Sequence, residues 1–489
     1  MRGNPATPSK ACQPCRAKRR KCDLVRPECS QCRRANIPCG GYRDSFSLRL
    51  RDQTSLAARK VQKRQSDAVT SSTDGSESAS GDENGQLISP VLSLSLSESP
   101  EFLSVSYFMN VYAPTSAFNY LIDVSPAFLT QKGLEHAFLA PALLFFSQNW
   151  RDSLARSLAQ KHYALALRSI NLALSNPDSA TADRTLLSVL LLSLFEALIF
   201  QGRSDPINWN AHTQGAMELL RLRGKQQFNG PLGRSLFRHA SMNIRTQCAQ
   251  LGLQAPSALA VLETGQFEEP SPREHQYRLF GQVVAGIASL RCERPQLTTS
   301  EVILRIFKLE ADIHQILIEF QKAMPFHTLD PTTLHKSIRS FRGRIDHYPS
   351  FGGARDMNTL RMVRLFIIRM LDETLVRRSV QPGAVPQDLF ARARTLIDLT
   401  SFEMIADILS SVPYILDIYD QPNFSARSLI YCLSGVAILR FTPLDAREYA
   451  VERLTFVGER YGFPQAIDSA KMVLQGKDLE KWIYLAVLS

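Results

Sequence analysis

The amino-acid sequence predicts a mostly α-helical protein with a small cysteine-rich N-terminal module, a disordered linker and a large all-α domain. Six of the nine cysteines lie within residues 12–39, and residues 65–101 hold 11 serines and no aromatic residue. After residue 102 the apolar residues recur at helical spacing. The chain has 489 residues, 44% of them hydrophobic, so it can bury a substantial core. We therefore divide it into a cysteine module (10–42), a basic helix-compatible segment (43–64), a Ser-rich acidic linker (65–101) and an all-α domain (102–489).

Positive charge is concentrated at the N-terminal end of the chain. Residues 1–64 carry 17 Lys and Arg against 4 Asp and Glu, whereas the rest of the chain is nearly neutral. This asymmetry indicates a polyanionic partner for the N-terminal part alone. The first eleven residues are polar, so we expect no secretory signal and a reducing, intracellular compartment. In that compartment clustered cysteines favour a metal site over disulfides.

The six clustered cysteines form two copies of one pattern, C-x2-C-x6-C. Thiolates are soft ligands, and tetrahedral sulfur sites suit zinc. Few apolar residues lie between the cysteines, so metal binding, worth about 10–16 kcal/mol in small zinc-folded peptides, must supply the stability that a core would give. Six thiolates give two zinc ions four ligands each only if two thiolates are shared. The predicted ligands are Cys12, Cys15, Cys22, Cys29, Cys32 and Cys39.

The segments ACQPCRAKRRKCD (11–23) and RPECSQCRRANIPC (26–39) resemble the fungal Zn(2)-Cys(6) binuclear zinc-cluster transcription factors. The resemblance implies two Zn2+ ions as cofactors, with the first and fourth cysteines shared between them. One zinc is then held by Cys12, Cys15, Cys22 and Cys29, and the other by Cys12, Cys29, Cys32 and Cys39. It also implies double-stranded DNA as the partner.

A run of basic residues lies between the second and third cysteines. In the resembling family the first helix enters the major groove and reads a CGG triplet, and the matching positions here are Lys18 and Arg19. Arg and Lys suit guanine because its O6 and N7 are adjacent acceptors. Many members have Arg-Lys where this chain has Lys-Arg, which leaves open which residue reads the base; a merely solvated charged face is the alternative. The predicted DNA-binding residues are Arg16, Lys18, Arg19, Arg20, Lys21, Arg33 and Arg34, of which Arg16, Lys21, Arg33 and Arg34 are assigned to phosphates.

Two segments follow the cysteine module. Residues 46–64 are basic and helix-compatible but hold no heptad pattern over three repeats, so a homodimer formed through them stays open. Residues 65–101 carry seven acidic residues and no Lys or Arg, and cannot bury enough surface to offset their chain entropy. Within and just beyond this linker, the acidic and aliphatic stretch 87–103 is either part of a tether or a site that recruits coactivators.

The remainder predicts helices over 183–200, 209–223, 299–324 and 357–378. The most apolar stretch, Leu186–Phe200, is shorter than a membrane span and contains Glu196, so we expect a buried core helix and no membrane partner. The segment WNAHTQGAMELLRLRG (209–224) resembles the fungal-specific transcription factor regulatory domain. This resemblance implies a regulatory role for the domain and leaves a small-molecule effector open.

These observations predict a zinc-dependent, sequence-specific DNA-binding transcription factor of the RNA polymerase II type. Its expected partners are DNA and the transcription machinery or coactivators, and the resemblance implies control of a metabolic pathway or gene cluster. We expect a nuclear location, because Lys18–Lys21 and residues 59–64 are basic enough for import recognition. We expect no enzyme, since no Walker A, GxGxxG, HExxH or GxSxG motif is present. The alternative is an effector-binding receptor or protein-interaction regulator whose zinc module is an accessory nucleic-acid-binding head.

Overall fold

The structure is a computed structural model that describes residues 11–18, 20–23, 29–37, 39, 99–199, 207–264, 272–330, 338–378, 385–418 and 422–476. The chain divides into two units, Met1–Leu94 and Ser95–Ser489, which we call the head and the body and treat separately. The basic segment 43–64 and the disordered linker predicted at 65–101, up to residue 98, lie outside the described residues. Most of the acidic-aliphatic stretch 87–103 also lies outside them.

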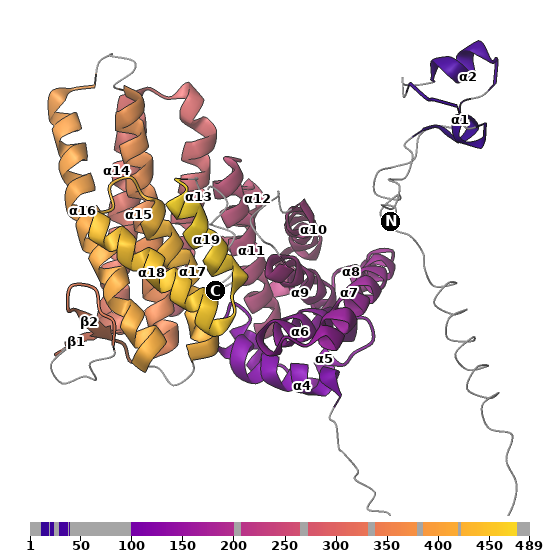
Figure 1. Ribbon diagram of the computed structural model, residues 1–489, viewed down its shortest axis with the longest axis horizontal. Helices are drawn as coiled ribbons and strands as arrows, with labels where there is room; N and C mark the ends of the chain where they lie inside the picture. The colour runs from indigo at the N-terminus through magenta and orange to yellow at the C-terminus, as the bar shows by residue number, and fades with distance from the viewer. Residues whose placement is uncertain are drawn as a thin grey trace, which may run out of the picture. The chain divides into compact units, whose positions relative to one another are not determined.

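In the first part of the body, each long helix contacts the next long helix along the chain (Figure 1). Its first helix starts at Pro100, two residues before the predicted boundary, because the Ser99 hydroxyl accepts a hydrogen bond from the Phe102 N–H at 3.2 Å. The elements up to residue 264 are α4 (Pro100–Tyr107), the π-turn η1 (Phe108–Tyr112), the 3-10 turns η2 (Ala113–Thr115) and η3 (Asn119–Asp123), α5 (Pro126–Leu129), α6 (Leu134–Trp150), α7 (Ser153–Leu174), α8 (Pro177–Ala180), α9 (Asp183–Ile199), α10 (Ile207–Arg223), η4 (Gly224–Phe228), α11 (Pro231–Leu251) and α12 (Ser257–Glu263).

Helix α9 forms the centre of this first part of the body. It contacts α6, α7 and α10, and nearly all of its side chains are buried, which confirms the predicted core helix. A helix that is covered on all sides needs apolar residues all round, which explains its many leucines. Its one interior charge, Glu196, accepts hydrogen bonds from the Tyr163 hydroxyl and from Asn208 Nδ2, the latter at 3.1 Å. The acidic group that interrupts the apolar stretch is therefore satisfied inside the fold.

The second part of the body is a further set of long helices in which neighbours along the chain pack together (Figure 1). Helix α14 begins with a capping box between Thr298 and Glu301, which the sequence analysis did not identify. Helix α15 begins six residues before the predicted start, because the Ser350 hydroxyl accepts from the Gly353 N–H at 3.1 Å. The elements are α13 (Pro272–Glu293), η5 (Arg294–Gln296), α14 (Thr299–Ala323), β1 (His327–Leu329), β2 (Ile345–His347), α15 (Phe351–Arg378), α16 (Gln387–Pro413), the π-turn η7 (Tyr414–Ile418), α17 (Pro422–Ile438), α18 (Leu444–Tyr461) and α19 (Pro464–Leu474).

The body is mostly α-helical as predicted, and its described residues also include a short antiparallel strand pair that the all-α prediction did not include. Strands β1 and β2 pair with Thr328 opposite Asp346. Three residues are too few to produce an alternating sequence signal. The pair is held by its side chains, since the fully buried Asp346 accepts from Thr328 Oγ1 at 2.8 Å and from Arg344 Nε at 3.0 Å.

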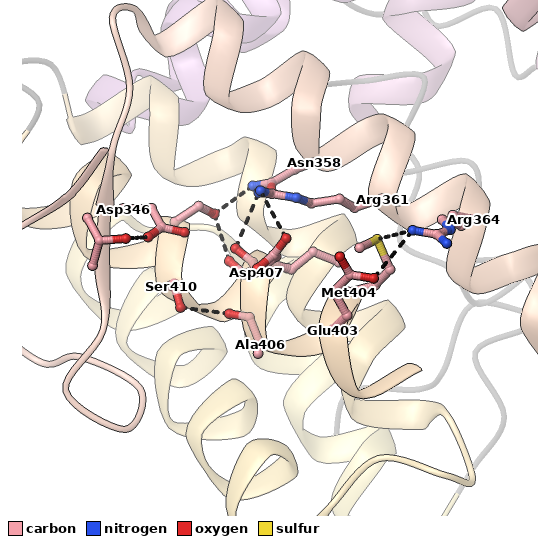
Figure 2. A network of polar contacts seen from close by, with 12 residues as sticks. Asp346, Asn358, Arg361, Arg364, Glu403, Met404, Ala406, Asp407 and Ser410 are labelled. Carbon is pink, nitrogen blue, oxygen red and sulfur yellow. Dashed lines mark hydrogen bonds and ion pairs between the residues drawn. The ribbon is translucent and has the colours of Figure 1, made fainter. Parts of the chain in front are cut away.

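A buried polar network connects this strand pair to α15 and α16 (Figure 2). The Arg361 guanidinium, 1% exposed, donates to the Tyr348 hydroxyl at 2.7 Å and to Asn358 Oδ1 at 3.1 Å. Its Nη2 lies 3.4 Å from Asp407 Oδ2, and the same carboxylate lies 2.8 Å from Arg344 Nη1. Two arginines therefore face two carboxylates, Asp346 and Asp407, so the charges of these four side chains balance, with Arg344 partly exposed at the edge.

Among the residues that the structure describes, one segment, Gln387–Ile418, is long and apolar enough to cross a membrane by length and composition. Its most apolar window is 72% buried inside the body. The segment covers α16 and η7, which contact α15, β2, α17 and α18. This burial is what a core helix of a folded domain requires, and we interpret the segment in that way.

Candidate metal centre and nucleic-acid interface

Two short helices position the cysteines of the head. Helix α1 covers Gln13–Ala17 and follows Cys12, and helix α2 covers Ser30–Arg34 and follows Cys29. Cys29 is the N-cap of α2, with its sulfur accepting from the Cys32 N–H at 3.4 Å. In each half, the C-x2-C spacing places one thiol just before a helix and the other within its first turn. The duplicated sequence pattern therefore produces two matching thiol pairs.

Four sulfur atoms from the two halves come together. The Sγ of Cys12 lies 3.6 Å from the Sγ atoms of both Cys29 and Cys32, and the sulfurs of Cys15 and Cys29 are 3.7 Å apart. All four sulfurs lie within 4.8 Å of one another. Tetrahedral zinc with Zn–S bonds of about 2.3 Å requires sulfurs about 3.8 Å apart. The thiols therefore have the chemistry and the spacing of a zinc–thiolate centre.

The two remaining cysteines lie at the edge of this cluster. Cys22 and Cys39 are half-buried and pack against the four buried thiols. Cys22 also forms a group with Cys29 and Asp23 whose ligand atoms lie within 4.8 Å of one another. Sequence reasoning did not single out Asp23, whose carboxylate accepts from the Ser30 N–H at 3.2 Å at the start of α2. Asp23 therefore joins the end of the first half to the second helix.

Burial changes the acid–base state of these thiols. Desolvation, followed by hydrogen bonds with the neighbouring thiols, raises the pKa of Cys15 to about 12. Desolvation is also the main cause that raises the pKa of Cys32 and of Cys12. Thiolates packed this closely require a compensating cation, and a divalent metal supplies it. Without a metal the raised pKa values keep these thiols protonated, and a divalent metal that displaces the protons suits this set of sulfur donors.

The chain after α2 turns back onto the cluster. Asn36 adopts the left-handed conformation with φ of 52°, which asparagine tolerates better than most residues. The Ile37 N–H then donates to the Cys32 carbonyl at 3.1 Å, and the Ile37 side chain packs against the thiols. This turn returns Cys39 to the cluster formed by the other cysteines.

The described basic side chains of the head are exposed. Helix α1 ends at Ala17, so Lys18 lies in the turn that follows the helix and not within it. The turn stays fixed, because the N–H groups of Lys18 and Arg20 donate to the Pro14 and Cys15 carbonyls at 3.1 Å and 2.8 Å. Arg19 and the side chain of Arg16 lie outside the described residues. The exposed basic residues are Lys18, Arg20, Lys21, Arg33 and Arg34.

Comparison with known families agrees with this geometry. Residues 10–49 match the fungal Zn(2)-Cys(6) binuclear cluster domain, and residues 102–248 match the fungal specific transcription factor domain. The second match ends within α11, so the resemblance that we expected across 102–489 is found for its first part. No curated protein and no solved structure matches the chain. The two matched domains, together with the cluster of cysteines, support a fungal-type DNA-binding transcription factor whose N-terminal domain binds two zinc ions.

Proposed function

We propose that the six cysteines hold two zinc ions, with Cys12 and Cys29 shared between them. In this assignment one zinc has Cys12, Cys15, Cys22 and Cys29 as ligands, and the other has Cys12, Cys29, Cys32 and Cys39. The sulfur contacts support the sharing. Three sulfur pairs that lie 3.6–3.7 Å apart, Cys12–Cys29, Cys12–Cys32 and Cys15–Cys29, each join two members of one ligand set. Cys12 and Cys29 are also fully buried, as shared ligands at the centre of a cluster must be.

We further propose that the domain spanning residues 10–42 reads a CGG-like triplet in double-stranded DNA through Lys18 and Arg19. The turn after α1 supports this role, because its backbone hydrogen bonds hold Lys18 and Arg20 next to a metal-fixed helix while their side chains stay exposed. Arg33 and Arg34 end α2 and are exposed, which suits contacts to phosphates. Arg16, Arg20 and Lys21 complete the basic surface.

Two single-charge variants separate base reading from electrostatic attraction. If Arg19 contacts a guanine, Arg19→Ala should weaken binding to a CGG duplex by about 1–3 kcal/mol and leave binding to a scrambled duplex nearly unchanged. Arg33→Ala should weaken binding to both duplexes alike and reduce the salt dependence by about one unit of slope. Binding is measured with the zinc-loaded full-length protein by fluorescence anisotropy at several salt concentrations.

The comparison has a clear negative outcome. If Arg19→Ala and Arg33→Ala lower binding to both duplexes by the same factor, Arg19 does not read sequence. Lys18→Ala is then the next variant to test. If Lys18→Ala also fails to change the ratio between the two duplexes, the head attracts DNA by charge alone, and the triplet assignment is wrong.

We propose that the all-α domain, residues 102–489, has no catalytic activity and regulates transcription in the nucleus, where it responds to an effector and contacts coactivators. The match of its first part to a transcription factor domain supports this role. Removal of residues 102–489 should leave zinc binding intact and change reporter output. If output and its regulation stay unchanged, the proposed role is wrong.

A fluorescent fusion should accumulate in nuclei, and exclusion of the fusion from nuclei under every growth condition would contradict the proposed location. A homodimer formed through residues 43–64 is tested by sedimentation of the full-length protein.

A further inference from the structure

The body contains a cavity of about 650 Å3 between α11, α13, α15 and the turns η2 and η3. We infer that this cavity binds a neutral, largely apolar organic molecule that carries a carbonyl or hydroxyl group. Its volume lies within the range of about 300–1,000 Å3 that is common for sites of small organic ligands. Binding of such a molecule does not depend on the proposed regulatory role and is tested separately. Only the effect of binding on transcription rests on that role.

Helical spacing places one face of each of three helices against the cavity. On α11 the lining positions include His239, Met242, Asn243 and Thr246, which have the i, i+3, i+4, i+7 spacing of one helix face. On α13 they include Tyr277, Phe280, Val284 and Ile287, and on α15 they include Thr359, Val363 and Phe366. The walls from α13 and α15 are thus largely apolar and partly aromatic, whereas α11 contributes polar groups. This pairing of apolar walls with a few polar groups is typical of a ligand site.

Asn243 is the polar group that most strongly indicates a ligand. The residue is 8% exposed and lines the cavity. Among the residues that the structure describes, its side-chain amide forms no hydrogen bond with another residue. Because the amide is open to the cavity, a molecule there that carries a carbonyl or hydroxyl group can accept a hydrogen bond from it or donate one to it.

His239 provides a second polar group in an uncharged form. Its Nδ1 lies 3.1 Å from the Tyr120 hydroxyl, and both residues line the cavity. Burial lowers the pKa of His239 to about 4, so its imidazole is neutral at physiological pH. The side chain therefore offers hydrogen bonding without a positive charge.

The charged residues at the cavity favour a neutral ligand. The Arg355 guanidinium donates to the Thr115 carbonyl and lies 2.7 Å from Asp356 Oδ1, so its charge is already balanced. Arg238 is exposed at the rim and lies 3.9 Å from Glu274 Oε1. Asp123, the one carboxylate among the lining residues, is exposed. No uncompensated buried cation among the lining residues would offset the desolvation of an anionic ligand.

The inference is tested with prodan, a neutral aromatic ketone whose fluorescence shifts to the blue in an apolar site. We expect the zinc-loaded full-length protein to bind prodan at one saturable site, and to bind the anionic fluorophore 1-anilinonaphthalene-8-sulfonate more weakly. Asn243→Leu keeps the side-chain size and removes the amide, and should weaken prodan binding about three- to tenfold. Thr246→Phe places a ring inside the cavity and should abolish binding.

Matched controls lie elsewhere in the body. Asn149 on α6 and Thr455 on α18 are half-buried and do not line the cavity, so Asn149→Leu and Thr455→Phe should leave prodan binding unchanged. Circular dichroism checks that each variant is folded. If a variant fails to fold, hydrogen exchange of the wild-type protein is measured with and without prodan in place of that variant. Prodan should then slow the amide exchange of residues 113–123 and α11.

Two results would overturn the inference. One is an absence of saturable prodan binding to the folded wild type, and the other is equal affinity in the wild type, Asn243→Leu and Thr246→Phe. DNA binding is measured on the same samples. A protein that binds the CGG duplex but not prodan contradicts the cavity assignment alone, whereas one that binds prodan but not DNA contradicts the proposed function alone.

Discussion

Replacement of Arg364 by methionine is expected to destabilise the body by about 3–5 kcal/mol, because it leaves a buried carboxylate without its cation. Arg364 on α15 donates to Glu310 Oε1 on α14 through Nε at 2.9 Å and through Nη2 at 2.7 Å. The two side chains are 4% and 9% exposed. Arg364 also lies 3.6 Å from Glu403 Oε2, but that side chain is 59% exposed and gains little from the contact.

The magnitude follows from two opposing contributions. Opposite charges about 4 Å apart attract by about 4 kcal/mol at an effective dielectric constant of about 20. Desolvation of each ion costs several kcal/mol, which offsets most of that attraction in the intact pair. Loss of Arg364 removes the attraction and keeps the cost of burying Glu310. The double variant Arg364→Met/Glu310→Leu removes both contributions and should lie within about 1–2 kcal/mol of the wild type.

Urea unfolding of the zinc-loaded full-length protein, followed by tryptophan fluorescence, measures these differences. All three tryptophans belong to the body, at positions 150, 209 and 482, so the signal reports on the body alone. Arg394→Met on α16 is the matched control, since Arg394 pairs with Asp398 at 3.4 Å while both side chains are more than half exposed. This control should cost about 0.5 kcal/mol or less. A loss below about 1 kcal/mol for Arg364→Met, or a double variant as unstable as that single variant, would refute the reasoning.

Three further outcomes are expected. Zinc analysis should give two ions per chain, and chelation should unfold the head while the tryptophan signal of the body stays unchanged; a count of one or zero would contradict the shared thiolates. Burial lowers the pKa of His239 to about 4, below its value in the unfolded chain, so stability should fall as the pH drops from about 6.5 towards 4. His239→Gln should reduce that slope by up to about 1.4 kcal/mol per pH unit, and an unchanged slope in pH-dependent urea unfolding would exclude this residue as a cause. Thr298→Ala removes the capping box of α14 and should cost about 1 kcal/mol in urea unfolding, whereas no loss would show that packing alone sets the start of the helix.

Part of this structure can be predicted from the sequence, because it depends on residues that lie close together in the chain. The cysteine spacing within residues 12–39 predicts a metal centre, since ligand type and short-range spacing suffice to bring the thiols near one another. Helix α14 ends one residue before the predicted end, and α9 is the buried helix that its leucines indicate. In α14 the apolar period and the end signals agree, and in α9 the length and composition of the apolar stretch indicate a buried helix.

Other features depend on contacts between residues far apart in the chain. The glycine pair Gly352-Gly353 weakens the local helix signal, yet α15 begins there because Ser350 caps it and its later turns pack on α14 and α16. The pairing of β1 with β2 depends on a carboxylate that Thr328 and Arg344 satisfy. Neither interaction leaves a periodic pattern in the sequence, because each depends on which side chains the fold brings into contact.

The metal centre and the cavity of the body differ in the same way, because the first depends on local sequence and the second on long-range contacts. The metal centre is built from thiols at most 27 positions apart, and their chemistry identifies them without a fold. The cavity of the body needs α11, α13 and α15, which span residues 231 to 378, to face one another. On α11 Asn243 is one polar residue among several, and its sequence neighbours do not distinguish it. Only the packing of the three helices buries its amide against a cavity, because the local sequence sets the face that a residue occupies and the tertiary structure sets what that face meets.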